Sequence, residues 1–200
     1  AYVGMVTVGE VSAGDTVVVS AAGGAVGSVA CEIARIRGAR VIGIAGAPDK
    51  VKYLEEELGC EAGIDYKNED VAARLAELAP NGVNVYFDNV GGELLDTVLD
   101  NLAPASRVVI CGAISQYQRM DNVRGPSLYL RLAERNSSMR GFTVDYHSAV
   151  FPQAERELTE WLVSGQFHLR EHVVEGIDGF PEALLTLFSG GHTGKLMVKP

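Results

Sequence analysis

A glycine-rich turn near the start of the chain has the residue types and spacing that bind phosphate. The segment 16–28 reads Thr-Val-Val-Val-Ser-Ala-Ala-Gly-Gly-Ala-Val-Gly-Ser, an apolar strand followed by a tight turn and the start of a helix. Its fingerprint is Ala22-x-Gly24-x-x-Gly27, in which alanine replaces the usual first glycine. Gly24 lets the backbone approach a pyrophosphate, Gly27 lets the helix pack closely on the strand, and the helix N-terminus attracts negative charge. We therefore predict that four consecutive residues bind the phosphates of a dinucleotide: Gly24, Ala25, Val26 and Gly27.

The end of the next apolar strand indicates which dinucleotide is bound. Sites for NAD place an acidic residue about 20 positions after the second fingerprint glycine, where it binds the ribose 2′-hydroxyl. Here Ala45 and Gly46 stand at the strand end, and Asp49 falls in the first turn of the following helix, where a carboxylate has an ordinary capping role. Gly46 leaves room for a 2′-phosphate and Lys50 supplies positive charge. The sequence therefore favours NADPH over NADH, with a solvated helix lysine as the alternative for Lys50.

Strands and helices alternate along the chain in the order that builds a parallel sheet. Apolar strands bounded by turns and separated by helices of roughly ten residues imply right-handed crossovers, so we predict an α/β fold with a doubly wound parallel sheet. The predicted strands are 17–20, 40–45, 62–65, 83–87, 107–111, 140–144, one starting at 172, and 195–199. The predicted helices are 26–37, 48–58, 69–78, 93–102, 129–135, 149–164 and 181–188.

Composition excludes several classes of function. The chain has 200 residues and is 47% hydrophobic, which suffices for one full domain with a sizeable core. Its net charge of −9 argues against nucleic acid as a partner, because such surfaces need basic stripes. We expect a cytoplasmic protein without a membrane partner, because the sequence contains neither a run of roughly 20 apolar residues nor a secretion signal. Cys31, Cys60 and Cys111 form no C-x-x-C pair and the histidines have no ligand spacing, so we expect no metal site.

Several motifs at successive strand ends occur together in one family. They are Ala21-Ala-Gly-Gly-Ala-Val-Gly27, Ala45-Gly-Ala-Pro-Asp-Lys50, Ile64-Asp-Tyr-Lys67, Val85-Tyr-Phe-Asp-Asn-Val-Gly-Gly92 and Ile110-Cys-Gly-Ala-Ile-Ser-x-Tyr117. In combination they resemble the zinc-independent medium-chain dehydrogenases/reductases. The branch that they resemble is that of prostaglandin reductase, leukotriene dehydrogenase and the alkenal double-bond reductases. The resemblance covers essentially the whole chain, as far as Gly194-Lys-Leu-Met-Val-Lys199.

The resemblance implies a second domain. Family members have an N-terminal GroES-like catalytic domain that this sequence lacks, so we expect the chain to be a fragment. Residues 1–171 would be the Rossmann NADP-binding domain, with 1–9 as the remnant of a helix that crosses between the domains. Residues 172–200 would be the segment that returns to the catalytic domain. We expect both ends to expose apolar surface, and the resemblance also implies a homodimer.

The resemblance assigns roles to individual residues. Lys50 and Tyr66 would contact the 2′-phosphate, and Tyr117 would stand near the nicotinamide and the substrate as the catalytic residue. The resemblance also implies cofactor contacts on the path to the nicotinamide, from Asn89, Cys111 and Ser115. The segment from Phe142 to Val144 would approach the nicotinamide carboxamide. A further implied contact is His192. Read without the family, Cys111 is a core residue, since buried cysteine behaves as a small hydrophobe, and Asp88 caps a turn.

His192 departs from the family pattern. Near the C-terminus the family often has asparagine two residues before Gly-Lys, close to the cofactor, and this sequence has histidine there. Histidine donates a hydrogen bond as asparagine does, but its charge depends on pH. The alternative is a solvent-exposed histidine in a glycine-rich turn.

The implied reaction is the NADPH-dependent reduction of the C=C bond of α,β-unsaturated ketones and aldehydes. Hydride would pass from the nicotinamide C4 to the β-carbon, and hydrogen bonds, with Tyr117 as one donor, would stabilise the enolate oxygen. Two alternatives remain open, a quinone reductase of a neighbouring branch and a non-catalytic NADPH-binding module. We expect the fragment alone to bind NADPH and to be nearly inactive.

Overall fold

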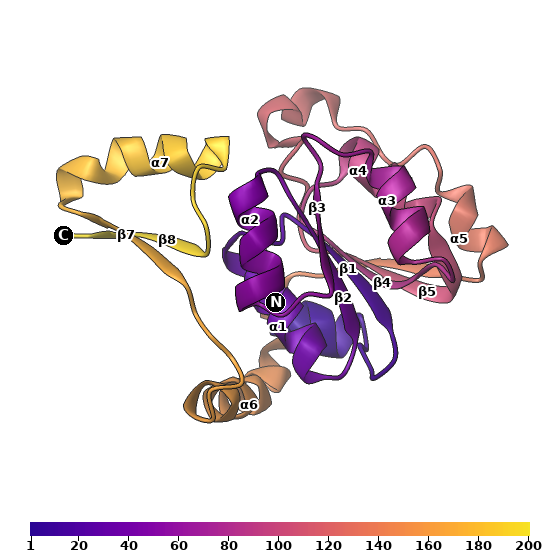
Figure 1. Cartoon of the computed structure of the whole chain (residues 1–200), viewed down its shortest axis with the longest axis horizontal. Helices are drawn as coiled ribbons and strands as arrows, with labels where there is room; N and C mark the ends of the chain where they lie inside the picture. Colours follow the sequence, from indigo (N-terminus) through magenta and orange to yellow (C-terminus); the bar gives the residue numbers. More distant parts are fainter.

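The centre of the molecule is a six-stranded parallel sheet with helices on both faces (Figure 1). The computed structural model describes the backbone of all 200 residues and every side chain except those of residues 118–120. The strand order is β3-β2-β1-β4-β5-β6, the order of the doubly wound fold that binds dinucleotides. The predicted α/β fold is therefore confirmed, and the order reverses between β1 and β4, where such folds bind their ligands.

The elements follow one another as the alternating pattern requires. The strands of the sheet are β1 (Thr16–Ser20), β2 (Arg40–Ala45), β3 (Ala62–Asp65), β4 (Val83–Asp88), β5 (Leu102–Ile110) and β6 (Ser138–Gly141). The helices are α1 (Ala25–Ile36), α2 (Pro48–Lys52), α3 (Val71–Leu78), α4 (Gly92–Leu99), α5 (Leu130–Glu134) and α6 (Phe151–Val163). Shorter helical segments are Val3–Val8, Tyr53–Glu57, Tyr117–Asn122, Val144–Val150 and Ile177–Gly179. The last elements are β7 (Glu171–Glu175), α7 (Phe180–Ser189) and β8 (Lys195–Lys199).

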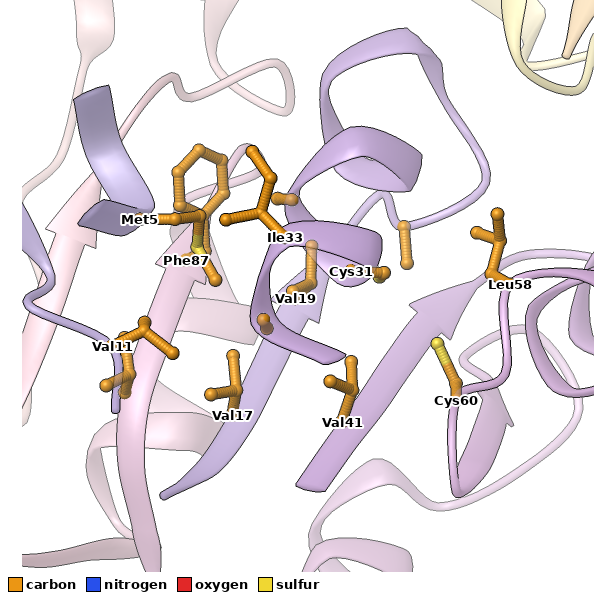
Figure 2. Close-up of a cluster of buried hydrophobic side chains, with 14 of the residues drawn as sticks. Met5, Val11, Val17, Val19, Cys31, Ile33, Val41, Leu58, Cys60 and Phe87 are labelled. Atoms are coloured by element: carbon orange, nitrogen blue, oxygen red, sulfur yellow. The ribbon is translucent and has the colours of Figure 1, made fainter. Parts of the chain in front are cut away.

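Apolar side chains form two separate cores, one on each face of the sheet. Along β1, Val17 and Val19 belong to the first core and Val18 to the second, which is the alternation of a strand buried on both faces. In the first core, Met5 from the N-terminal turn meets Ile33 of α1 and Phe87 of β4 (Figure 2). Burial of each such side chain contributes about 1.5–3 kcal/mol, so the two cores hold the sheet and the loops at its edge in place.

The N-terminal segment packs differently from the prediction for residues 1–9. We expected an exposed apolar surface there, and this is wrong, because Tyr2, Val3, Met5 and Val8 are buried in the first core. The hydroxyl of Tyr2 also donates a 2.7 Å hydrogen bond to Glu157 of α6. The segment therefore finds its packing partners within this chain.

Several predicted boundaries of helices and strands are also wrong. The predicted helix 93–102 ends at Leu99, and β5 begins at Leu102 rather than at 107. The start of β5 is irregular, because Leu102 pairs with Val83 whereas Arg107 pairs with Val85, so the residues between them bulge. They include Pro104, which cannot donate to a neighbouring strand and hides the strand signal. The strand predicted at 140–144 is β6, which ends at Gly141.

The C-terminal residues form a small unit beside the main sheet (Figure 1). Here β7 and β8 pair in parallel as a separate two-stranded sheet, and α7 connects them. Large apolar side chains of α7 are exposed, including Leu185 at 71% and Phe188 at 57%. This exposed apolar face agrees with the expectation for residues 172–200, whose role as a returning segment stays a prediction. Among the helices of the described chain, none has the length and apolarity to span a membrane.

Candidate functional site

The glycine-rich turn between β1 and α1 lies at the carboxyl edge of the sheet. Gly24 precedes α1 with an extended backbone, so the first free N–H groups of the helix follow it directly. A Cβ atom on Gly27 would lie 2.3 Å from the carbonyl oxygen of Ala21 and 2.7 Å from the Cα of Ala22, so only glycine fits there. Ala21 is the residue of the turn with a positive φ, 49°, and Ala22 is fully buried. An alanine is therefore tolerated in place of the first fingerprint glycine.

Three of the predicted cofactor residues, Gly46, Lys50 and Tyr66, belong to the corner formed by the segments that follow β2 and β3. The ring of Tyr66 lies over Gly46, where an added Cβ would be 2.5 Å from the ring. The stem of Lys50 runs past Gly23, and its Nζ donates a 2.6 Å hydrogen bond to the carbonyl oxygen of Gly190. Burial, and secondarily the charge of Lys67, lowers the pKa of Lys50. The corner thus holds a partly desolvated ammonium, from Lys50, and an aromatic ring, from Tyr66.

Asp88, at the end of β4, fixes the loop that follows it. Its fully buried carboxylate accepts hydrogen bonds from the hydroxyls of Tyr86 (2.8 Å) and Ser20 (3.1 Å). It also accepts from the backbone N–H groups of Val90 (2.9 Å) and Gly91 (3.0 Å). Burial, together with the negative charge of Asp88, raises the pKa of Tyr86 well above its usual value. The prediction that Asp88 caps a turn is confirmed.

Asn89 joins the ends of the two central strands. Its backbone N–H donates to the hydroxyl of Ser20 (2.9 Å), and its side-chain amide donates to the Ser20 carbonyl oxygen (2.7 Å). Asn89 therefore lies beside the glycine-rich turn, which begins after Ser20. The structure places this predicted cofactor residue at the carboxyl edge of the sheet.

The loop after β5 folds over the same edge and carries three predicted residues. The backbone N–H of Cys111 donates to the carbonyl oxygen of Asp88 (2.8 Å), and burial raises the pKa of the Cys111 thiol. The hydroxyl of Ser115 donates to the carbonyl oxygen of Val90 (2.6 Å). The phenol of Tyr117 accepts a 3.1 Å bond from the N–H of Ala113, so its own proton is available for donation. Tyr117 is 52% exposed.

Phe142 and Val144 follow β6, at the far side of the edge. The Phe142 ring packs against the first core and touches Gly4, where an added Cβ would lie 2.8 Å away. Val144 is half-exposed and begins a short helical turn. Phe142 therefore has a packing role that its sequence position did not indicate, and its backbone remains at the edge of the sheet.

His192 is placed against the glycine-rich turn by the C-terminal unit. It is only 8% exposed, so the alternative of a solvent-exposed histidine is wrong. The N–H of Gly194 donates a 2.9 Å bond to the carbonyl oxygen of Gly23, and Gly190 accepts the bond from Lys50 described above. This contact joins residues that are far apart in the sequence, and no local pattern predicts it.

No group of three or more histidine, cysteine, aspartate or glutamate side chains that could hold a metal ion occurs among the residues that the structure describes. The donors gathered at the edge are instead backbone N–H groups, an ammonium, an imidazole and hydroxyls. Such donors recognise phosphate and other anions. The edge is therefore suited to a phosphorylated ligand.

Comparison with known proteins agrees with this interpretation. Residues 25–161 match the family described as zinc-binding dehydrogenase. The chain is 43% identical over its whole length to YfmJ of Bacillus subtilis (strain 168), provisionally named an NADP-dependent oxidoreductase, and covers 60% of that protein. It is 38% identical to prostaglandin reductase 1 of Bos taurus, with the whole chain covering 61% of that enzyme. The crystal structure of CurA in complex with NADPH from Vibrio vulnificus superposes with a TM-score of 0.92 at 38% identity, over 99% of this chain and 60% of CurA.

The chain thus spans about 60% of the length of the relatives that it matches. The family match begins at Ala25, at the start of α1, and covers the corner and the loops at the ends of β4 and β5. Four of the motifs quoted from the sequence, those between Ala45 and Tyr117, lie wholly within the matched residues. The chain belongs to the zinc-binding dehydrogenase family, and within it to the zinc-independent medium-chain dehydrogenases/reductases that its motifs predicted.

Proposed function

We propose that the chain binds NADPH and forms the cofactor-binding half of an oxidoreductase that reduces the C=C bond of α,β-unsaturated ketones and aldehydes. The observation that carries the cofactor is the corner of Gly46, Lys50 and Tyr66, which offers an ammonium and lacks a carboxylate at the end of β2. CurA, a similar structure, was solved with NADPH. The name of prostaglandin reductase 1 supports the reductase activity.

Different hydrogen-bond donors at the carboxyl edge of the sheet would bind different parts of the cofactor. The backbone N–H groups at the start of α1 would hold the diphosphate, because they have no partners within the helix. Lys50 uses one of its three N–H donors on Gly190, which leaves two for a 2′-phosphate. Asn89 and the loop from Cys111 to Tyr117 would border the nicotinamide end. The bound NADPH would supply the hydride.

Tyr117 would act on the substrate rather than on the cofactor phosphates. Its oxygen accepts the bond from Ala113, so its proton is not used in that bond and would be available to the oxygen of an enone. A hydrogen bond there stabilises the negative charge that develops on the substrate oxygen as hydride reaches the β-carbon. We assign this role to Tyr117 because its phenol is exposed, lies on the loop after β5 and keeps its proton free, whereas the hydroxyl of Ser115 donates to Val90.

The remaining wall of the site would come from the part of the protein that the relatives have and this chain does not cover. The division into a cofactor domain at 1–171 and a returning segment at 172–200 belongs to this proposal. So does the homodimer, for which β6 at the edge of the sheet offers a strand to pair. The exposed apolar face of α7 is the surface expected to contact the additional part.

Replacing Lys50 with alanine is expected to weaken NADPH binding by about 1.5–3 kcal/mol, or roughly 10- to 150-fold, because one charge-assisted contact to the 2′-phosphate is lost. Binding of NADH, which has no 2′-phosphate, should change less than about twofold. Isothermal titration calorimetry measures both. The matched control is Lys52→Ala, two residues further along α2, where the lysine is exposed. Equal losses for NADPH and NADH would contradict the assignment of Lys50.

The proposed reaction is tested by steady-state assay of the full-length protein, including the part that this chain does not cover, with NADPH and a panel of enones, enals and quinones. We expect NADPH oxidation with several enones and a saturated product in which the C=C bond alone is reduced. Tyr117→Phe should lower kcat by about 100- to 1,000-fold, the range for loss of one oxyanion donor, with a smaller effect on NADPH binding. Activity with quinones alone would favour the quinone reductase instead. Absence of activity with every substrate would favour a non-catalytic module.

A further inference from the structure

The turn that carries His192 is held against the phosphate-binding loop at two points. On one side of the histidine, the carbonyl oxygen of Gly190 accepts the 2.6 Å hydrogen bond from Lys50. On the other side, Gly194 pairs with Gly24 as an isolated parallel bridge, and its N–H donates to the carbonyl oxygen of Gly23. The two anchors leave His192 directly between the lysine corner and the glycine-rich turn. Neither anchor uses the imidazole.

The imidazole itself is buried with an unused polar atom. His192 is 8% exposed, and its Nδ1 has no hydrogen-bond partner among the described residues. An unpartnered buried nitrogen costs about 1–3 kcal/mol, so its presence requires an explanation. A ligand oxygen that accepts a hydrogen bond from the His192 ring supplies such an explanation.

We propose that His192 is a titrating member of the phosphate site, which takes up a proton and donates it in a hydrogen bond to a phosphate oxygen when the dinucleotide binds. The inference rests on the proposed binding of NADPH and adds a proton linkage to it. The proton comes from solvent, and the imidazole becomes an imidazolium while no covalent bond of the ligand changes. Affinity for the phosphorylated cofactor then rises as the pH falls.

The charges around His192 determine the sign of the effect. Burial lowers the pKa of His192, and so do the charges of Lys50 on α2 and His172 on β7, whereas a bond to the Thr186 backbone in α7 raises it. Lys67, after β3, faces Lys50. The empty ring is therefore neutral at pH 7. A phosphate carrying about −1.5 to −2 charges offsets Lys50 and favours the imidazolium.

The affinity gain appears in a defined pH window. It is complete below the pKa of the empty ring, which lies under the usual value of about 6.5, and it is lost as the pH rises through the higher pKa of the complex. Across this window one proton can change the affinity by at most about tenfold per pH unit. The 2′-phosphate, with a second pKa of about 6, loses charge as the pH falls and acts in the opposite direction. A variant without the imidazole is needed to separate the effect of His192 from the effect of the 2′-phosphate.

The test is calorimetric titration of the full chain with NADP⁺, which is stable in acid, between pH 6 and pH 8. Each titration is done in two buffers of different ionisation enthalpy, so that proton uptake is measured directly. We expect net uptake near pH 7 in the wild type, and a gain in affinity from pH 8 to pH 6 that is about three- to tenfold larger than in His192→Asn. His172→Asn, which replaces an exposed histidine on β7, should keep the proton uptake.

Nuclear magnetic resonance of the imidazole nitrogens of the wild type gives a second readout that needs no variant. Addition of NADP⁺ at pH 7 should shift the His192 nitrogens toward the values of the protonated ring. If NADP⁺ binds with the same pH dependence in wild type and His192→Asn, or if the His192 nitrogens stay neutral, the inference is wrong. If NADP⁺ fails to bind at any pH, the proposed function is wrong instead.

Discussion

Replacing Asp88 with alanine is expected to lower the free energy of unfolding by about 3–5 kcal/mol, the largest stability effect that we predict. Its carboxylate is fully buried and accepts bonds from two hydroxyls and two backbone N–H groups. Each buried donor left without a partner costs about 1–3 kcal/mol, and the loop after β4 can relax to recover part of this. Urea unfolding followed by circular dichroism measures the change.

Two variants make the Asp88 prediction specific. Asp88→Asn keeps the shape of the side chain and one acceptor oxygen, so its loss should be intermediate. Asp100→Ala removes an exposed carboxylate that pairs with Arg131, and it should cost less than about 1 kcal/mol. A loss in Asp88→Ala no larger than that in Asp100→Ala would show that the described network does not hold the loop.

Replacing Gly27 with alanine is expected to impair both stability and cofactor binding. The added Cβ meets backbone atoms of Ala21 and Ala22 at 2.3 and 2.7 Å, and backbone cannot rotate away as a side chain can. Overpacking of this kind costs about 1–3 kcal/mol, and the shift of α1 away from β1 moves its N-terminal N–H groups. We therefore expect NADPH affinity to fall at least about tenfold, since a displaced helix N-terminus no longer meets the diphosphate.

The control for Gly27 is Gly125→Ala. An added Cβ at Gly125 meets nothing within 4 Å, so stability and NADPH affinity should both stay close to those of the wild type. Thermal unfolding and calorimetry of the two variants provide the comparison. Wild-type affinity in a folded Gly27→Ala protein would mean that the turn is a structural turn and binds no phosphate.

The sequence predicted the parts of the fold where local pattern and global packing agree. The bounds of β2 and β3 are those that the apolar runs indicated, because turn residues flank both strands and both are buried on two faces. The position of the glycine-rich turn could be predicted equally well, because its backbone constraints act over few residues. The corner of Gly46 and Lys50 could be predicted because no carboxylate stands at the end of β2. This absence, too, is visible within a few neighbouring residues.

Features that depend on contacts distant in the chain could not be read in this way. Whether Phe142 packs in the core or faces a ligand depends on Gly4, which lies at the opposite end of the sheet domain in sequence. The burial of His192 depends on the pairing of Gly194 with the turn at Gly23 and Gly24. The N-terminal residues were expected to be exposed because the segment was compared with a longer protein, whereas α1 and α6 bury it here.

The central claim is that this chain binds NADPH by contacts to the 2′-phosphate of the cofactor. Calorimetric titration of the wild-type chain with NADPH and, separately, with NADH tests it most directly, because the two cofactors differ only in the group assigned to Lys50. We expect NADPH to bind at least about tenfold more tightly, which corresponds to about 1.4 kcal/mol. Equal affinities for the two cofactors, or binding of neither, would contradict the account.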